Sequence, residues 1–321
     1  MSFKCGLVGM PNVGKSSIFN LLTKQSISAD NYPFCTIDPN NAFVEVPDSR
    51  LTKLASINKS KKITNAAIEF VDIAGLIKGA STGEGLGNEF LTHIKQTDVI
   101  AHVVRFFRDD DVIHVNGSPN PESDFQDINL ELILSDLSVT QKYSDNLKKT
   151  KKPLQNKLEL IRDIDSLIQH LYEEKPAREF NYTENLNNLT DLKLLTKKPM
   201  FVIANIDENI EGADKFKLDN QINNMVPINA IIEQEIAGLN SEEQQIFLQD
   251  LGMKETALER IIKTGYELLD LKTFFTSGEK ESRAWAARKR YNASQCSGII
   301  HSDIEKGFIR AETIAYEDYI K

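Results

Sequence analysis

The residues best suited to chemistry begin with a glycine-rich turn that ends in a lysine and a serine. Residues 9–16 read Gly-Met-Pro-Asn-Val-Gly-Lys-Ser, the Walker A pattern, between an apolar strand at 3–8 and a helix at 17–22. Glycines at both ends let the backbone point its N–H groups at a phosphate, and the helix N-terminus favours an anion. Lys15 would reach the β- and γ-phosphates, and Ser16 would offer its hydroxyl to Mg²⁺. The residues expected to bind nucleotide here are Asn12, Val13, Gly14, Lys15, Ser16 and Ser17.

Two further segments complete this prediction. The apolar run 67–72 ends in Asp72-Ile73-Ala74-Gly75, a D-x-x-G pattern at the end of a strand. Asp72 would hold Mg²⁺ through water, and the Gly75 N–H would contact the γ-phosphate. In the loop between the two motifs, Thr36 is the candidate that closes over Mg²⁺ and the γ-phosphate, as in an order–disorder switch.

The residue after Gly75 is Leu76, whereas many G proteins place a glutamine there to orient the attacking water. A leucine cannot do this, so another group must position the water. Four glycines within residues 79–87 predict a segment that responds to the γ-phosphate.

The segment expected to contact the base departs from the guanine-specific N-K-x-D pattern. An apolar strand at 198–205 runs into Asn205-Ile206-Asp207-Glu208, so isoleucine and glutamate replace the lysine and aspartate. A glutamate carboxylate is misplaced for the guanine hydrogen bonds, which predicts weaker guanine preference and acceptance of ATP. Asn229 and Ala230, after the strand 225–228, would form a second loop beside the base.

Together these motifs resemble the Obg-like ATPases, the YchF-type branch of the Obg family of translation-associated P-loop NTPases. The matching segments, which extend over nearly the whole chain, are 9–16, 33–37, 72–81, 83–88, Asn205-x-x-Glu208 and 307–312. The resemblance implies ATP hydrolysis in preference to GTP, Mg²⁺ as cofactor and association with the ribosome and its RNA.

The resemblance also implies the architecture. We expect an α/β protein in which a P-loop G domain, a mostly parallel sheet with helices on both faces, carries an inserted antiparallel helical hairpin. A partial C-terminal TGS domain of β-grasp fold would follow, shortened because the family pattern continues past Lys321. The expected boundaries are 1–122 and 197–273 for the two parts of the G domain, 123–196 for the hairpin and 274–321 for the TGS domain.

Two site residues follow from the resemblance alone. His114 aligns with a histidine proposed in the family to help position water, so His114 joins Lys15 and Gly75 as catalytic candidates; a structural loop histidine is the alternative. Asn12 occupies the position where some related NTPases hold a stimulating K⁺, although a polar residue without that role fits equally. Arg105 and Arg108 are expected at the surface rather than as an arginine finger.

Other segments carry structural expectations. Residues 124–148 and 154–172 are expected to be helical, with a seam formed by Leu154, Leu158, Ile161, Ile164, Ile168 and Leu171. The basic turn at 148–153 could contact ribosomal RNA phosphates or simply be solvated. We also expect helices within 231–269 and at 304–313, strands at 271–276 and 281–287, and Trp285 in the core.

Composition excludes several classes of protein. The 321 residues include 38 basic and 47 acidic side chains, a net charge of −9, which argues against a chain-wide nucleic-acid-binding surface but permits a local basic patch. DNA is not expected as a partner. No apolar run reaches membrane-spanning length and three scattered cysteines suit a reducing compartment, so we expect a cytoplasmic protein that is not bound to a membrane and is monomeric.

Two other functions remain open at this point. One is a GTPase of the same fold, and the other is a nucleotide-gated ribosome-binding module whose hydrolysis is incidental.

Overall fold

The computed structural model describes residues 3–26, 40–73, 86–109, 111–114, 117, 119–150, 156–187, 189, 192–207, 211–220 and 222–321. These residues form two compact units. One contains residues 1–5, 17–71 and 231–321, and the other contains residues 6–16 and 72–230. Thr36, Gly75, Leu76 and Glu208, all singled out above, lie outside the described residues.

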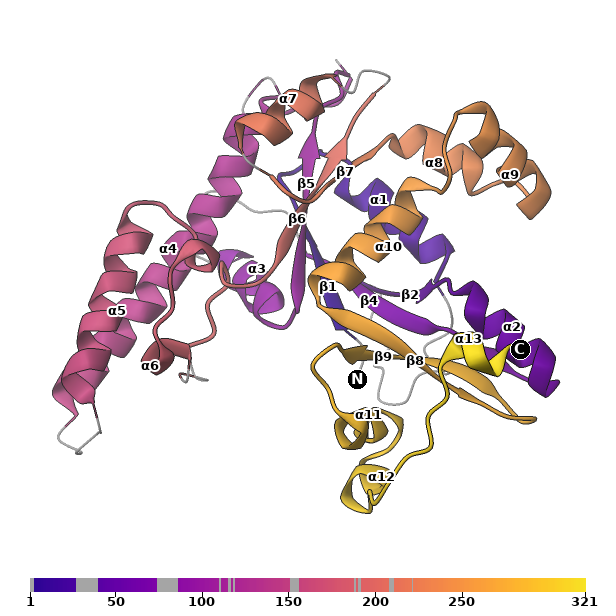
Figure 1. Cartoon of the computed structure of the whole chain (residues 1–321). Helices are drawn as coiled ribbons and strands as arrows, with labels where there is room; N and C mark the ends of the chain where they lie inside the picture. Colours follow the sequence, from indigo (N-terminus) through magenta and orange to yellow (C-terminus); the bar gives the residue numbers. More distant parts are fainter. Residues whose placement is uncertain are drawn as a thin grey trace. The chain divides into compact units, whose positions relative to one another are not determined.

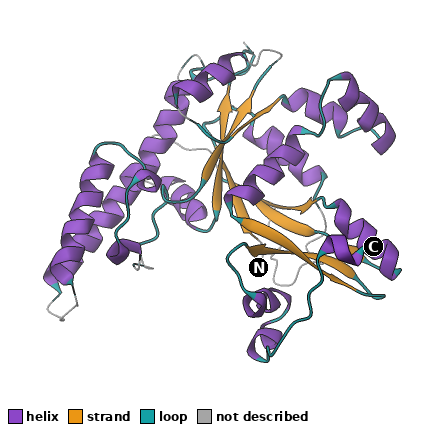
Figure 2. Ribbon diagram, viewed as in Figure 1, coloured by secondary structure: helices purple, strands orange, loops and turns teal. Residues whose placement is uncertain are grey.

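The larger sheet has six strands in the order β2-β4-β1-β5-β6-β7 (Figures 1 and 2). Their bounds are Phe3–Val8 (β1), Asn41–Val46 (β2), Ala66–Asp72 (β4), Val99–Arg105 (β5), Met200–Asn205 (β6) and Met225–Ile228 (β7). β2 pairs antiparallel with β4, whereas β5–β6 and β6–β7 are parallel. The expected α/β class is confirmed; the sheet, expected to be mostly parallel, is mixed because β2 pairs antiparallel, and helices cover both faces.

The central strand β5 is buried along its whole length, as expected for a strand covered on both faces of a sheet. Its last residue, Arg105, pairs with Asn205 of β6, and Asn205 pairs with Ile228 of β7. The carboxyl ends of these three strands therefore meet at one edge. This register brings residues that are about a hundred positions apart in the sequence to one place.

The unit that contains residues 72–230 also contains five of the α-helices in the described part of the chain. Their bounds are Leu86–Lys95 (α3), Pro121–Lys149 (α4), Lys157–Tyr172 (α5), Glu184–Asn187 (α6) and Glu211–Asp219 (α7), with a 3₁₀ turn at Ala177–Glu179. α4 begins with Asn120 as N-cap, whose side chain accepts a hydrogen bond from the backbone N–H of Ser123.

α4 and α5 form the expected helical hairpin, but one part of the predicted seam is wrong. The buried stripe of α5 has a 4-3-4 spacing and consists of Leu160, Ile164, Leu167 and Leu171. Leu158 is 75% exposed, because it lies in the first turn on the far side from Leu160, which packs with Leu147 of α4. Ile161 and Ile168 flank the stripe, and Leu154 lies outside the described residues.

The other unit contains a second, three-stranded sheet in the order β3-β9-β8. Its strands are Ile63–Thr64 (β3), Leu271–Ser277 (β8) and Ser282–Arg288 (β9). The helices of this unit are Lys15–Lys24 (α1), Ser49–Asn58 (α2), Ala230–Ile236 (α8), Ser241–Asp250 (α9), Ala257–Leu268 (α10), Ala293–Ile300 (α11), Ser302–Lys306 (α12) and Tyr316–Tyr319 (α13); α1 and α8 each begin in the other unit.

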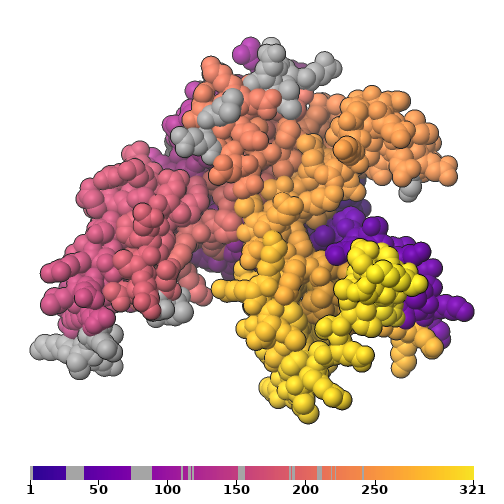
Figure 3. Space-filling view, in the orientation of Figure 1, coloured from indigo at the N-terminus to yellow at the C-terminus, as the bar shows by residue number. Residues whose placement is uncertain are grey.

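Two expectations for the C-terminal region are wrong. α12 ends at Lys306, and no helix continues to residue 313, because the following residues bury little surface; Ile309, for example, is 91% exposed. The C-terminal segment is the yellow surface in Figure 3. Trp285 is half-buried rather than in the core; its indole stacks on Phe274 and donates to the Thr276 hydroxyl. Among the described residues, no helix is long and apolar enough to cross a membrane.

Candidate functional site

The Walker A residues form the loop that connects β1 to α1. Gly14 has a φ of +89°, and a Cβ at this position would collide with the side-chain amide of Asn205. A Cβ on Gly9 would lie 2.8 Å from the backbone oxygen of Val103. Both glycines are therefore required by the close approach of neighbouring strands. Lys15 and Ser16 open α1, so the first N–H groups of this helix follow the loop directly.

Two of the predicted residues meet beside this loop. Lys15 Nζ forms an ion pair with the carboxylate of Asp72 at the end of β4, and the two side chains are 10% and 20% exposed. Ser16, the next residue of α1, is exposed. A hydroxyl and a carboxylate are the hard oxygen donors that Mg²⁺ prefers, so this donor set fits that ion.

Asn205 braces the phosphate-binding loop from the end of β6. Its side chain is buried, and Nδ2 donates to the backbone oxygen of Val13 at 3.0 Å. The next residue, Ile206, is half-buried and its N–H donates to Ile228 at 2.9 Å. Asn229 and Ala230 follow directly after β7, so the described residues expected at the base lie at the ends of adjacent strands.

Arg105 is not at the surface, and this expectation is wrong. Its guanidinium is 1% exposed and donates to four backbone oxygens, those of Asp109 at 3.0 Å, Val112 at 3.1 Å, Phe107 at 3.2 Å and Asn12 at 3.5 Å. The group also lies 4.3 Å from the centre of the Phe107 ring. The five donors of a guanidinium satisfy carbonyls that a tight loop leaves unpaired, which explains why a cation is buried here.

A second contact ties the loop after β5 to the phosphate-binding loop. Asn12 is exposed, has a φ of +62°, and donates from Nδ2 to the backbone oxygen of Ile113 at 3.0 Å. Asn12 therefore contacts the segment after β5 twice, by donating to Ile113 and by accepting a hydrogen bond from Arg105. Arg105 and Phe107 are the residues that the sequence-based prediction missed; the only signal was a charged residue at the end of a fully apolar strand.

The structure places the side chain of His114 away from solvent. His114 Nε2 lies 2.9 Å from Asp124 Oδ2 in the first turn of α4, and both side chains are 1% exposed. Burial raises the pKa of Asp124, and the hydrogen bond from His114 acts in the opposite direction. The described conformation therefore turns this imidazole toward α4.

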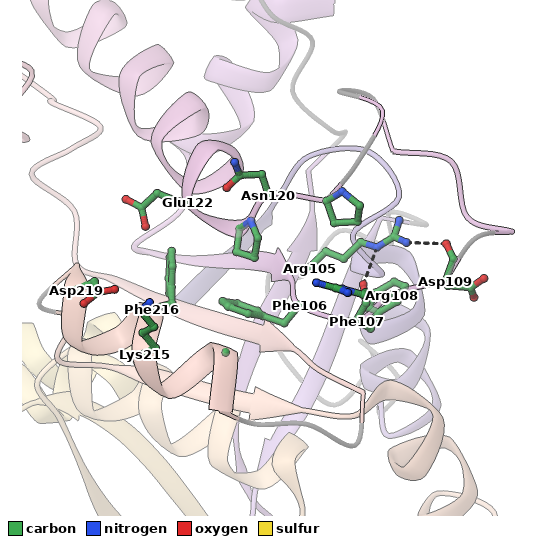
Figure 4. A pocket seen from close by; sticks show the side chains of 13 residues that line it. Arg105, Phe106, Phe107, Arg108, Asp109, Asn120, Glu122, Lys215, Phe216 and Asp219 are labelled. Atoms are coloured by element: carbon green, nitrogen blue, oxygen red, sulfur yellow. Dashed lines mark hydrogen bonds between the residues drawn. The ribbon is translucent and has the colours of Figure 1, made fainter.

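An open pocket of about 650 Å³ lies between the loop after β5, the start of α4 and α7 (Figure 4). Phe106 and Phe216 form an aromatic wall with an edge-to-face contact of 5.2 Å between ring centres. Arg108, Lys215 and Asp219 contribute charged side chains at the rim. The pocket adjoins the same 105–109 segment that contacts the phosphate-binding loop.

A Walker A loop on a mixed α/β sheet, with an aspartate at the end of the neighbouring strand, defines the class of P-loop nucleotide-binding proteins. Residues 4–206 match a family model described as "50S ribosome-binding GTPase", and residues 271–321 match one described as "Protein of unknown function (DUF933)". Ribosome-binding ATPase YchF of Bacillus subtilis is 47% identical over all of this chain and 90% of its own length. The protein of the same name from Haemophilus influenzae is 46% identical, over all of this chain and 91% of its own length.

A solved structure agrees with these comparisons. The Schizosaccharomyces pombe YchF GTPase is 36% identical to this chain and superposes with a TM-score of 0.82, covering 96% of this chain and 86% of its own. The chain therefore belongs to the YchF family. The C-terminal family model carries no TGS designation, so the TGS domain and the Obg branch stay predictions.

Proposed function

We propose that this protein is a Mg²⁺-dependent P-loop ATPase that prefers ATP to GTP and binds the ribosome. The observation that carries the proposal is the Lys15–Asp72 ion pair beside the Walker A loop, which joins the two motifs that phosphoryl transfer requires. The curated relatives quoted above are named ribosome-binding ATPases.

The phosphate side of the site follows from these positions. Lys15 releases Asp72 and binds the β- and γ-phosphates, while backbone N–H groups of residues 12–17 surround them. Ser16 and Asp72 would hold Mg²⁺ together with Thr36, and the Gly75 N–H would contact the γ-phosphate. When bound, Mg²⁺ neutralises charge on the phosphate oxygens.

The residues proposed to contact the base determine which nucleotide the site prefers. Asn205 ends β6 next to the phosphate-binding loop, and Ile206 and Glu208 follow it in the chain; Asn229 and Ala230, which follow β7, would form the second loop beside the base. Because Glu208 replaces the aspartate that pairs with guanine, hydrogen bonding no longer selects guanine strongly.

Catalysis consists mainly of positioning and charge stabilisation. His114 orients the attacking water, the role that Leu76 cannot perform, and Asn12 is the site at which K⁺ would stimulate turnover. Asn12 holds Ile113, the residue before His114, by the hydrogen bond described above, so the phosphate-binding loop and the water-positioning residue are connected.

The partner surface is proposed at the tip of the helical hairpin. Lys148 and Lys149 are exposed at the end of α4, and ribosomal RNA phosphates would attract them. We keep the division into a G domain (1–122 and 197–273), a hairpin (123–196) and a partial TGS domain (274–321), in a monomeric cytoplasmic protein that binds no DNA.

A GTPase is the second candidate, because the matching family model and the solved structure both carry that word in their descriptions. A nucleotide-gated binding module with incidental hydrolysis is the third, and the buried side chain of His114 favours it over the GTPase.

The test is ATP hydrolysis by the Lys15→Ala protein, with Lys24→Ala as the matched control. Lys24 lies exposed at the other end of α1. We expect Lys15→Ala to lose hydrolysis by at least about 100-fold and Lys24→Ala to keep it. Equal activity of the two variants would refute the proposed site.

A further inference from the structure

His114 and Asp124 form a buried pair that links the segment after β5 to the first turn of α4. Asp124 lies in the first turn of α4, where the helix dipole favours a carboxylate. Its Oδ2 contacts His114 Nε2 at 2.9 Å, whereas its Oδ1 has no hydrogen-bond partner in the part of the chain that the structure describes. Asp124 is thus buried with one oxygen unsatisfied, which makes the pair an arrangement of limited stability.

The backbone before His114 is held against the phosphate-binding loop. Arg105 donates to residues 107, 109 and 112, and Asn12 donates to Ile113, the residue directly before His114. The backbone is therefore already next to the Walker A loop, while the imidazole points into the interior. Rotation of one side chain, rather than movement of the whole loop, would bring the imidazole out.

From this geometry we propose that Asp124 is a positioning residue that withholds His114 from the nucleotide, so that hydrolysis requires the pair to open. The inference rests on the catalytic role proposed for His114. The described structure holds the pair closed at 2.9 Å, so the withheld conformation is taken as that of the resting protein. The proposal therefore predicts slow basal hydrolysis.

The position of Asp124 also gives a route for regulation. α4 begins at Pro121 and continues for 29 residues to the basic tip of the hairpin. A partner that displaces this helix moves Asp124 away from His114. Ribosome binding at the hairpin would then accelerate hydrolysis without touching the nucleotide.

The test compares ATP hydrolysis by wild type, Asp124→Asn and Asp124→Ala. Asparagine keeps the shape but weakens the hydrogen bond, and alanine removes it. We expect kcat to rise in the order wild type, Asp124→Asn, Asp124→Ala, by at least about threefold at the end of the series, with KM for ATP unchanged. If Asp124→Ala does not fold, the comparison of kcat between wild type and Asp124→Asn tests the proposal by itself. Asp145→Asn, an exposed change on the same helix, is the control.

A second measurement reads the position of the imidazole directly. Diethyl pyrocarbonate modifies exposed histidines, and peptide mass spectrometry gives the rate at each position. His301 is exposed and His102 is fully buried, so they serve as internal references. We expect faster modification of His114 in Asp124→Asn with both references unchanged; an unchanged rate at His114 would overturn the proposal.

Variants of His114 separate this inference from the function on which it rests. In the double variant His114→Ala/Asp124→Asn, the gain in kcat should disappear. If His114→Ala alone leaves hydrolysis unchanged, the catalytic role of His114 fails and the inference fails with it. If His114→Ala lowers hydrolysis and the Asp124 variants lower it too, Asp124 supports the active conformation, and only the withholding role is overturned.

Discussion

The guanidinium of Arg105 holds the loop after β5 in the shape that the candidate site needs. In place of water, the buried guanidinium hydrogen-bonds to four backbone carbonyl oxygens, one of which belongs to Asn12 in the phosphate-binding loop. A neutral side chain of similar length would leave these carbonyls buried without a donor. Arg105 therefore stabilises the folded chain and also positions Asn12 and Ile113.

We expect Arg105→Met to lower the free energy of unfolding by about 2–4 kcal/mol, because several buried acceptors lose their donor. Arg108→Met is the matched control, since Arg108 lies three residues along and is exposed. Its effect should stay within about 0.5 kcal/mol. Urea denaturation measures both values. A result in which the two variants are equally stable would contradict the role given to Arg105.

The sequence predicted the residues expected to bind phosphate better than it predicted the residues that hold the surrounding loops in place. Lys15 and Asp72 were found from spacing alone, because phosphate binding constrains the residues at each position of the motif. Arg105 was misplaced because charged residues are exposed in most proteins, and only the three-dimensional position of four carbonyls explains its burial. The burial of His114 depends on Asp124 of α4, and the sequence contained no signal for that contact.

At the scale of elements, α4 is attached to the segment that leads into β6. The buried carboxylate of Asp136 accepts hydrogen bonds from Leu195 N at 2.7 Å, Thr196 N at 2.8 Å and Thr196 Oγ1 at 2.6 Å. Burial raises the pKa of Asp136, although these hydrogen bonds act in the opposite direction. The hydrogen bonds of Asp136, a titratable group, thus connect α4 to the segment that precedes β6.

The raised pKa gives a prediction with a definite sign. The folded chain binds a proton at Asp136 at higher pH than the unfolded chain does, so this group's contribution to stability is largest at low pH and is lost as pH rises through the folded pKa. We therefore expect wild type to gain stability relative to Asp136→Asn as pH falls from about 7 toward about 4.

Urea denaturation of both proteins across this range measures the difference. Asp145→Asn, an exposed change on α4, corrects for general effects of pH. An advantage of wild type that grows with rising pH would contradict the assignment.

The helices and strands show where pattern reasoning succeeds. The four strands expected at 3–8, 67–72, 198–205 and 225–228 and both hairpin helices are present within a few residues of their expected bounds, because burial on a sheet or between two helices imposes a strict period. Leu158 is exposed and the helix expected at 304–313 ends at Lys306, because the apolar side chains there fit a helical period without another element to bury them. A periodic pattern indicates a helix only where another element buries it.

At the scale of the whole molecule, the proposed partner surface depends on charge. The chain has a net charge of −9, so attraction to RNA must come from a local basic cluster such as Lys148 and Lys149. Lys148 also contacts Asp165 of α5 at 2.9 Å, an exposed pair that contributes little to stability. Both lysines are therefore available for substitution without loss of the fold.

We expect Lys148→Glu/Lys149→Glu to weaken ribosome binding at least about fivefold at low salt, with a smaller difference at high salt. Co-sedimentation with ribosomes measures the effect, and ATP affinity should not change. Lys24→Glu/Lys53→Glu changes two exposed lysines elsewhere and serves as control. Equal loss in both double variants would show that general charge, not the hairpin, determines binding.

The central claim is that the site prefers ATP. Competitive binding of ATP and GTP to the purified protein with Mg²⁺ tests it most directly, with Lys15→Ala as the control that should bind neither. We predict that ATP binds at least tenfold tighter, a difference of about 1.4 kcal/mol. If GTP binds tighter, the interpretation of Ile206 and Glu208 is wrong and the protein is a GTPase of the same fold.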